Sequence, residues 1–508
     1  MRRMTAAQIT QSGEISRKQC RLLMERLEQE NVGVHSLMVW QRGKTLWEHW
    51  WAPYAKEKKH TLFSVSKTFN GLAVGFAVQE GYLSLDDRVV SFFPEYLPYP
   101  ACENMERMTI RHLLTMSTGL EADPHDFYEK RPEDFRDASP CCYHDYQPTL
   151  SADWIRNFFH SYVKYRPGTE FVYCTHGSYL LSAIVQKVVG KKTADYLAEK
   201  LFQPLGITDY FWETGPDGRT VGGWGLMLKT EDLLKVGIFL LQEGQWQGKQ
   251  LLNAEWVRAA TSSQIPIVGL PGEPNTTGYG YQIWIDQRER AYAMRGAFGQ
   301  FCAVFPEREL IVAVTAGAPD ENAGKILNAI WEELTSNCNP KEDAEETNRQ
   351  KETQLPRIPW PEGEPSVKCE TAKRVNGIRF VLADNFLRFR ALRFCFGAED
   401  ELTLETQEGI FTLPIGFQEW KSGKTCVKTA DTDTDTSILF ERASCSGAWE
   451  KERYHLRLCF DETAYIHDFW ITFPGDSVYI RHQRNCSFID AVNLTMAGVQ
   501  AEKMLLEI

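Results

Sequence analysis

A segment that is charged first and proline-rich later divides the 508-residue chain into two regions with different hydrophobic periods. It runs over residues 339–365 and reads NPKEDAEETNRQKETQLPRIPWPEGEP, without a sustained apolar stripe. Such a composition is typical of a linker. The sequence therefore predicts two domains, residues 1–338 and 366–508, each long enough to bury its own core without a metal or disulfide staple.

Helical and strand patterns are mixed in the first region. Close to its end, apolar side chains recur at helical spacing between Glu321 and Thr335, namely Ala323, Ile326, Leu327, Ile330, Trp331 and Leu334. We expect this stretch to be a helix packed on a sheet. A second helical pattern begins near Ser64 and closes at Gly81, with apolar positions Phe69, Leu72, Ala73, Phe76 and Ala77.

The period changes to two after the linker, as expected for strands. One such run is Ile378, Phe380 and Leu382, and the next is Leu387, Phe389 and Ala391. In DFWITFPGDSVYIRH, residues Pro474 to Ser477 separate two further strand-like runs. The second region is therefore expected to be an antiparallel β domain.

The run DTDTDTS at residues 431–437 resembles the opening of a calcium loop. Its sixth position is Thr436 where such loops have Gly, and its twelfth is Arg442 where they have Glu. We therefore interpret it as a solvated hairpin turn.

The composition excludes several classes of function. The chain carries 56 Lys and Arg against 68 Asp and Glu, for a formal net charge of −12, and no basic segment is dense enough for nucleic acid to be an expected partner. The N-terminal residues lack the apolar run of a secretory signal, and no run of about 18 apolar residues spans a membrane. The 13 scattered cysteines fit neither a disulfide framework nor a zinc spacing. These features predict a cytoplasmic protein with reduced thiols, no metal and no membrane partner.

The strongest chemical signal is Ser64, which stands three residues before Lys67 at the start of the apolar helical pattern. This spacing places both side chains on one helical face. A serine hydroxyl becomes a nucleophile when a base takes its proton, and a lysine kept neutral by burial is able to do so. The free N–H groups of a helix N-terminus also favour developing negative charge. The alternative is that Ser64 only caps the helix and Lys67 lies on its surface.

The same spacing occurs at Ser161 and Lys164, where Tyr165-Arg166-Pro167-Gly168 follows directly. Proline does not continue a helix, so this pair is expected to end a helix and not to open one. We do not expect it to be catalytic.

Several segments in order resemble the serine β-lactamase-like family, which includes class C β-lactamases, penicillin-binding carboxypeptidases, esterases and nylon-oligomer hydrolases. FSVSKTF and the following EGYLSLDDRVVSFFPEY resemble its nucleophile helix and the turn after it. MTIRHLLTMSTGL at 108–120 and PGTEFVYCTHGSYLLSAIVQKVVGK at 167–191 are similar to its next two motifs. Segments 222–252 and 292–317 also fall in the expected order. The resemblance extends over roughly residues 15–338 and excludes the C-terminal domain.

The resemblance implies an α/β (α+β) catalytic domain of the β-lactamase and transpeptidase type, with an antiparallel sheet flanked by helices, followed by the C-terminal β domain. It implies Ser64 as the acylated nucleophile, Lys67 as its activating partner and Tyr173 as a tyrosine that shares protons with them. A phenolate at Tyr173 needs a nearby cation near neutral pH, and Lys67 is the obvious one. The backbone N–H groups of Ser64 and Ala297 would form the oxyanion hole, with Gly296 allowing the close approach.

Two positions depart from the family's pattern. Thr175 stands where the second motif has Asn, and it cannot reproduce an amide that both donates and accepts. Met294 stands where the third motif has Lys, which removes a cation that commonly holds a substrate carboxylate. Arg295 could substitute, although neighbours on a strand face opposite sides. These departures favour esters or amides over β-lactams or D-alanyl peptides.

The predicted substrate contacts are Thr175, Met294, Arg295, Gly296, Phe298 and Tyr128. Tyr128 belongs to the charged and aromatic segment 121–151, which has no clear period and is a candidate binding loop or a buried structural loop. Phe127, Tyr143 and Tyr146 in that segment are further candidate pocket walls. His176 is expected to be structural or a solvent contact.

We therefore expect a serine hydrolase that acts through a Ser64 acyl-enzyme on a small ester or amide, with no metal or organic cofactor. The sequence leaves the oligomeric state open. One alternative is a β-lactamase or D-alanyl carboxypeptidase, against which the missing signal peptide counts. The other is a non-catalytic binding or regulatory protein that uses the C-terminal β domain.

Overall fold

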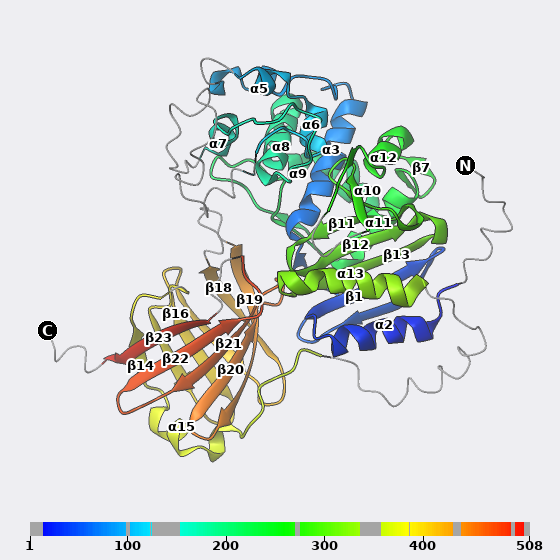
Figure 1. Ribbon diagram of the computed structural model, residues 1–508. Coiled ribbons are helices and arrows are strands. Elements are labelled where there is room, and N and C mark those ends of the chain that lie inside the picture. Colours follow the sequence, from blue (N-terminus) through cyan, green and yellow to red (C-terminus); the bar gives the residue numbers. More distant parts are fainter. Residues whose placement is uncertain are drawn as a thin grey trace.

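Two antiparallel sheets organise the protein (Figure 1), one with eight strands and one with ten. The computed structural model describes residues 14–97, 102–121, 123, 153–269, 275–335, 357–385, 387–429, 438–488 and 493–501. Every statement below refers to these residues. Tyr128, Phe127, Tyr143, Tyr146 and the run at 431–437 lie outside them.

The eight-stranded sheet has the order β2-β1-β13-β12-β11-β10-β9-β8. Because β1 pairs with β13 and β2 pairs with β1, the N-terminal hairpin adds to a strand that lies more than 200 residues later in the chain. The strands are β1 (Val34–Gln41), β2 (Lys44–Trp50), β8 (Ile265–Pro266), β9 (Thr276–Tyr279), β10 (Trp284–Asp286), β11 (Tyr292–Gly296), β12 (Gln300–Phe305) and β13 (Leu310–Ala316).

Helices cover both faces of this sheet. Figure 1 shows α2 (Arg17–Gln29) and α13 (Asp320–Thr335) side by side on one face. The other face packs against a layer that contains α3 (Ser66–Gln79), α8 (Thr175–Val189) and α11 (Thr230–Leu241). Alternate residues of each strand therefore enter different apolar cores. The helix predicted near residue 335 is confirmed as α13.

The remaining elements of this region are short. They include a three-stranded sheet in the order β3-β5-β4 and a two-stranded sheet, β6-β7. The helices are η1 (Phe63–Val65), α4 (Val89–Phe92), η2 (Pro94–Tyr96), α5 (Glu103–Arg107), α6 (Ile110–Leu114), α7 (Trp154–Phe159), α9 (Thr193–Leu197), η6 (Ala198–Phe202), α10 (Gln203–Leu205), α12 (Ala254–Ala260), η7 (Arg288–Arg290), η8 (Ala297–Gly299) and η9 (Pro306–Arg308). The strands are β3 (His60–Thr61), β4 (Phe211–Trp212), β5 (Leu226–Leu228), β6 (Gln245–Trp246) and β7 (Lys249–Gln250).

The predicted helix that closes at Gly81 is also confirmed, as α3. Gly81 has φ +76° and its N–H donates to the carbonyl of Val78 at 3.0 Å, while the N–H of Tyr82 reaches the carbonyl of Ala77 at 2.9 Å. These bonds satisfy the last carbonyl groups of the helix, as the glycine at this position indicates.

The ten-stranded sheet forms the C-terminal β domain, in the order β17-β16-β15-β14-β23-β22-β21-β20-β19-β18. It curls until its two edges approach, because Gly416, directly after β17, bridges to Ser446 of β19. The sheet is thus nearly barrel-like around an apolar core. Its strands are β14 (Arg379–Leu382), β15 (Ala391–Cys395), β16 (Asp400–Glu405), β17 (Ile410–Ile415), β18 (Lys421–Thr429), β19 (Ile438–Glu450), β20 (Arg453–Cys459), β21 (Ile466–Thr472), β22 (Ser477–Arg484) and β23 (Asn493–Gln500), preceded by η11 (Ser366–Lys368) and α15 (Glu370–Val375).

The predicted strands of this domain are confirmed except for one part. The first run is β14, and the two runs around Pro474 are the antiparallel neighbours β21 and β22. The prediction of a strand over Leu387 and Phe389 is wrong. Asn385 binds the carbonyl and the N–H of Phe389 through its side chain, so these residues form a turn before β15. Leu387 and Phe389 are nevertheless buried, which is why they alternate with polar residues.

The turn between β20 and β21 docks onto the first domain near the start of α3. The N–H of Thr61 donates to the carbonyl of Glu462 at 2.9 Å, and the Lys58 ammonium lies 2.7 Å from the buried carboxylate of Asp461. The side-chain amide of Asn485 donates to the carbonyl of Gly317 at 2.8 Å. The two domains are therefore held together beside the segment that carries Ser64. Within the described ranges, no helix has the length and apolar character needed to cross a bilayer.

Candidate active site

Ser64 lies in the single turn η1, directly before α3 begins at Ser66. The Ser66 hydroxyl fixes this turn, since it donates to the carbonyl of Phe63 at 2.6 Å and accepts from the N–H of Leu226 at 3.1 Å. Ser64 is half-buried, whereas its neighbours on both sides are buried. The turn thus leaves Ser64 partly exposed among buried residues.

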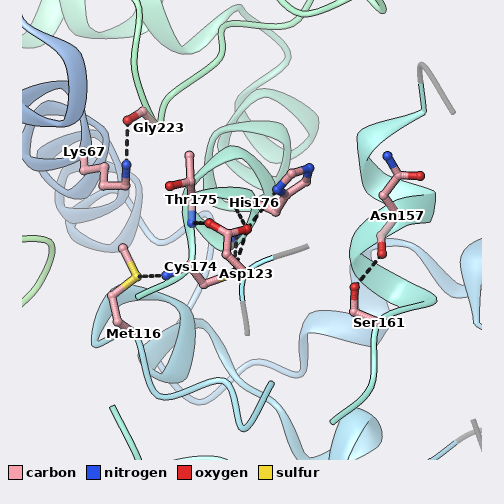
Figure 2. Close-up of polar contacts among 10 residues, drawn as sticks. Lys67, Met116, Asp123, Asn157, Ser161, Cys174, Thr175, His176 and Gly223 are labelled. Atoms are coloured by element: carbon pink, nitrogen blue, oxygen red, sulfur yellow. Dashed lines mark hydrogen bonds and ion pairs between the residues drawn. The ribbon is translucent and has the colours of Figure 1, made fainter. Parts of the chain in front are cut away.

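Lys67 is buried one turn further on, with 1% of its surface exposed. Its ammonium donates to Ser64 Oγ at 2.9 Å and to the carbonyl of Gly223 at 2.8 Å; Figure 2 shows the second bond. Burial lowers the pKa of Lys67 from 10.5 to about 7, against a smaller opposing effect of the Asp123 carboxylate. Near neutral pH, a large fraction of Lys67 is therefore neutral and able to accept a proton from Ser64.

Tyr173 ends the segment before α8 and faces the same lysine. Lys67 Nζ lies 4.9 Å from the centre of the Tyr173 ring, and the ring stacks on Trp284 at 5.5 Å. Burial raises the pKa of Tyr173 well above its ordinary value, and a hydrogen bond with Ser64 offsets this only in part. Tyr173 is thus a neutral phenol at rest. The phenolate considered from the sequence is not favoured, because its cationic partner is itself partly deprotonated.

Asp123 is a residue that the sequence analysis missed. Its carboxylate accepts hydrogen bonds from the backbone N–H groups of Thr175 and His176 and lies 3.0 Å from Nδ1 of His176 (Figure 2). These N–H groups are among the first of α8, where a carboxylate is most favourable. Asp123 therefore fixes the helix start that follows Tyr173. Its position in the segment 121–151, interpreted as either a binding loop or a buried structural loop, was the only signal in the sequence.

The third motif lies against the segment that carries Ser64. Gly296 ends β11, and a Cβ atom there would collide with the carbonyl oxygen of Leu62, two residues before Ser64. The absent side chain therefore lets β11 lie directly against the nucleophile segment. Ala297 follows, half-buried like Ser64. The chain thus brings the two proposed oxyanion-hole residues to one place.

The two residues before Gly296 are both buried. Met294 is 1% exposed within the core between the sheet and the helical layer. The guanidinium of Arg295 lies 5.4 Å from the centre of the Trp284 ring and donates to Thr276 Oγ1 at 2.9 Å. The burial of Met294 does not support the predicted contact with substrate. The guanidinium of Arg295 is already engaged by Trp284 and Thr276.

Phe298 does not line the site, contrary to the sequence-based prediction. Its side chain is fully buried, in a cluster with aromatic residues of the C-terminal domain. Thr175 is half-buried at the start of α8, and its methyl group and carbonyl would lie only 3.1 Å from a Cβ atom at Gly223. Thr175 therefore lies beside the carbonyl that binds Lys67.

The second Ser-x-x-Lys pair is not assembled. The Ser161 hydroxyl donates to the carbonyl of Asn157 at 2.7 Å, just after α7 (Figure 2), and Lys164 pairs with Glu121 at 2.6 Å. In the part of the chain that the structure describes, no group of three or more His, Cys, Asp or Glu side chains is placed to hold a metal ion. The described cysteines are free thiols.

A family model described as Beta-lactamase matches residues 21–334. The chain is 22% identical over 368 residues to a beta-lactamase of Escherichia coli (strain K12), covering 61% of this chain and 90% of that protein. It is 23% identical over 315 residues to the 6-aminohexanoate-dimer hydrolase of Paenarthrobacter ureafaciens, covering 59% of this chain and 76% of that protein.

Solved structures show the same fold. EstCE1, described as a hydrolase with promiscuous acyltransferase activity, superposes with a TM-score of 0.50 at 17% identity. The likeness covers 63% of this chain and 98% of that one. At this level of identity the comparison concerns the fold of the first domain.

Proposed function

The chain belongs to the beta-lactamase family, a family of hydrolases, and on that premise we propose that it is a serine hydrolase that forms an acyl-enzyme on Ser64. The substrate class we propose is a small ester or amide. The observation that carries the proposal is the 2.9 Å contact between Lys67 Nζ and Ser64 Oγ, made by a lysine whose pKa burial lowers to about 7. A surface lysine near a capping serine would have neither property.

In acylation, neutral Lys67 accepts the Ser64 hydroxyl proton while Oγ attacks the carbonyl carbon of the substrate. A tetrahedral intermediate forms, and its collapse breaks the bond to the leaving group. Tyr173, as a neutral phenol next to both residues, donates a proton to that leaving group and regains one from Lys67. The proton taken from Ser64 thus leaves with the alcohol or amine.

The negative oxygen of the intermediate needs donors that are already in position. The backbone N–H groups of Ser64 and Ala297 are the candidates, since Gly296 lets the two segments approach closely. In deacylation, water attacks the acyl-enzyme in the same environment, the acid leaves, and Ser64 regains its proton.

The surroundings of the site favour an ester or amide without a carboxylate beside the scissile bond. Met294 is apolar and buried, and the Arg295 guanidinium is engaged with Trp284 and Thr276. A β-lactam or D-alanyl peptide carries such a carboxylate and would lack a free cation at these two positions.

Intact-protein mass spectrometry after exposure to a fluorophosphonate probe tests the nucleophile. We expect one adduct on the wild-type chain, none on Ser64→Ala, and full labelling of Ser161→Ala, which changes the serine of the second pair. Turnover of a nitrophenyl ester without turnover of a chromogenic cephalosporin would support the substrate class. Absence of labelling and of turnover would overturn the proposal, while cephalosporin turnover would favour a β-lactamase.

A further inference from the structure

Two aromatic residues with left-handed backbone conformation flank the proposed oxyanion hole. Phe63, directly before Ser64, has φ +47°, and Phe298, directly after Ala297, has φ +60°. Among the described non-glycine residues with positive φ, these two are the ones with aromatic side chains. Bulky residues rarely adopt this conformation, so the surrounding structure must hold them there.

The side chains that hold them come from the other domain. The Phe63 and Phe298 rings contact each other edge to face at 5.1 Å between centres. Tyr465 lies 6.3 Å from Phe63 and 6.0 Å from Phe298, and Phe488 lies 4.5 Å from Phe298. We call these four residues the aromatic clamp. Phe63 and Phe298 are part of the apolar core of the C-terminal domain, not of their own.

The part of the C-terminal domain that supplies Tyr465 is itself tied down. The side-chain amide of Asn485 donates to the carbonyl groups of both Gly317 and Ala464 at 2.8 Å. A Cβ atom at Gly317 would collide with the carbonyl of Ala464, so the two domains touch through their backbones here. On the other side, the N–H of Ala318 donates to the carbonyl of Phe298 at 3.0 Å. The residues next to the aromatic clamp are therefore fixed by hydrogen bonds and close backbone contacts between the two domains.

We propose that Tyr465 and Phe488 are positioning residues for the oxyanion hole, so that the C-terminal β domain is a structural part of the catalytic site. This inference rests on the proposed function. The two rings keep Phe63 and Phe298 in their left-handed conformations, which aims the neighbouring N–H groups of Ser64 and Ala297 at the same point. Donors in an oxyanion hole act through fixed geometry, so loosening their support lowers the rate of the chemical step more than it weakens substrate binding.

The first test removes the Tyr465 ring. Losing an oxyanion donor typically lowers kcat about 100-fold or more, and a loosened pair should lower it about 10- to 100-fold with KM within about threefold of wild type. Tyr465→Phe keeps the ring and should restore kcat, whereas Tyr465→Ala should not. Phe473→Ala is the matched control, because Phe473 is buried in the same domain but contacts Phe380 and Trp449. It should leave kcat of the folded protein unchanged.

A second variant guards against loss of folding. Phe488 is 41% exposed, so Phe488→Ala removes little of the core. It should lower kcat about 3- to 10-fold and weaken binding of a boronic acid, whose tetrahedral adduct needs the same donors, by a similar factor. Tyr479→Ala, at an aromatic position of the same domain that is 50% exposed, is the control and should change neither value.

The outcomes separate the two proposals. If the fluorophosphonate does not label wild-type Ser64, both the proposed function and this inference are overturned. If wild type is labelled and active but Tyr465→Ala and Phe488→Ala, shown folded by their melting curves, keep wild-type kcat, the positioning role alone is overturned. Changes in KM with kcat intact would also overturn it, since they would point to substrate contact.

Discussion

The buried environment of Lys67 disfavours the positive charge that a lysine side chain ordinarily carries. It is 1% exposed, its ammonium donates to a hydroxyl and a carbonyl, and burial brings its pKa to about 7. A buried ammonium that no carboxylate contacts by a hydrogen bond is costly, and the chain retains it at the position where a proton acceptor is needed. The environment of this one side chain sets the pH range of the proposed chemistry.

We expect kcat/KM for an ester substrate to rise with pH and to reach a plateau, with a midpoint near 7. The reason is that Lys67 accepts a proton only in its neutral form, and its pKa is lowered to about 7. A pH profile of the wild type measures this. Lys67→Met should lower kcat/KM by about 10² to 10⁴. Lys164→Met, which changes the lysine of the second pair, should leave the profile as it is.

Lys67 should also lower the stability of the folded state. Its pKa is about 7 when folded and near 10.5 when unfolded, so between these values the unfolded chain binds more protons and stability rises with pH. Below pH 7 the penalty is fully present. Lys67→Met should therefore be more stable by about 1–3 kcal/mol at pH 6, and by less at pH 10. Denaturant unfolding at both values checks this, and an unchanged difference would contradict it.

At the scale of elements, hydrophobic period and capping signals were sufficient where burial alone decides structure. They located α3, α13 and the β21–β22 hairpin. The same signal failed at Leu387 and Phe389, because buried residues of a turn alternate just as strand residues do. Periodicity reports which side chains are buried, and only indirectly the backbone that buries them.

The meeting of β11 with the turn η1 is the element contact on which the proposed oxyanion hole depends. Gly296→Ala would push a Cβ atom against the carbonyl of Leu62, so we expect kcat to fall about 100-fold. Gly324→Ala is the control, because a Cβ at Gly324 in α13 meets nothing within 4 Å. It should leave kcat unchanged and raise stability by up to about 1 kcal/mol. Steady-state kinetics and thermal melts of both variants test this.

The candidate site was predictable only in part for a related reason. Ser64, Lys67 and Tyr173 lie in segments whose order resembles a known family, so they were identified without knowledge of their contacts. Asp123 and the aromatic clamp act through contacts between distant parts of the chain, and Tyr465 lies about 400 residues after Phe63. No periodicity or spacing in a single sequence encodes such a pairing.

At the scale of the whole molecule, the boundary between the domains is polar as well as aromatic. His35 Nδ1 lies 3.0 Å from His60 Nε2, and His35 stacks on Tyr54 at 3.7 Å between ring centres. Both histidines are buried, and His60 interacts with the backbone of Thr463 in the C-terminal domain. Burial lowers the pKa of His60 to about 4 and that of His35 well below its usual range.

This pair should make the folded protein sensitive to acid. Between about pH 6.5 and 4 the unfolded chain binds protons at His60 that the folded chain does not, so the free energy of unfolding falls as the pH falls. We expect His60→Asn to remove about 1–3 kcal/mol of that fall. His160→Asn, after α7 and outside this boundary, is the control. An identical pH dependence of unfolding in wild type and His60→Asn would contradict the prediction.

The near-closure of the ten-stranded sheet has a consequence for how the protein behaves at high concentration. An open sheet of this size would offer two long rows of unpaired N–H and C=O groups, to which strands of neighbouring molecules add readily. The bridge between Gly416 and Ser446, with the N–H of Gly447 on the carbonyl of Gly416 at 2.9 Å, turns those rows toward each other. The two edges are thereby joined at one point, and a change that opened this contact would favour aggregation before it unfolded the core.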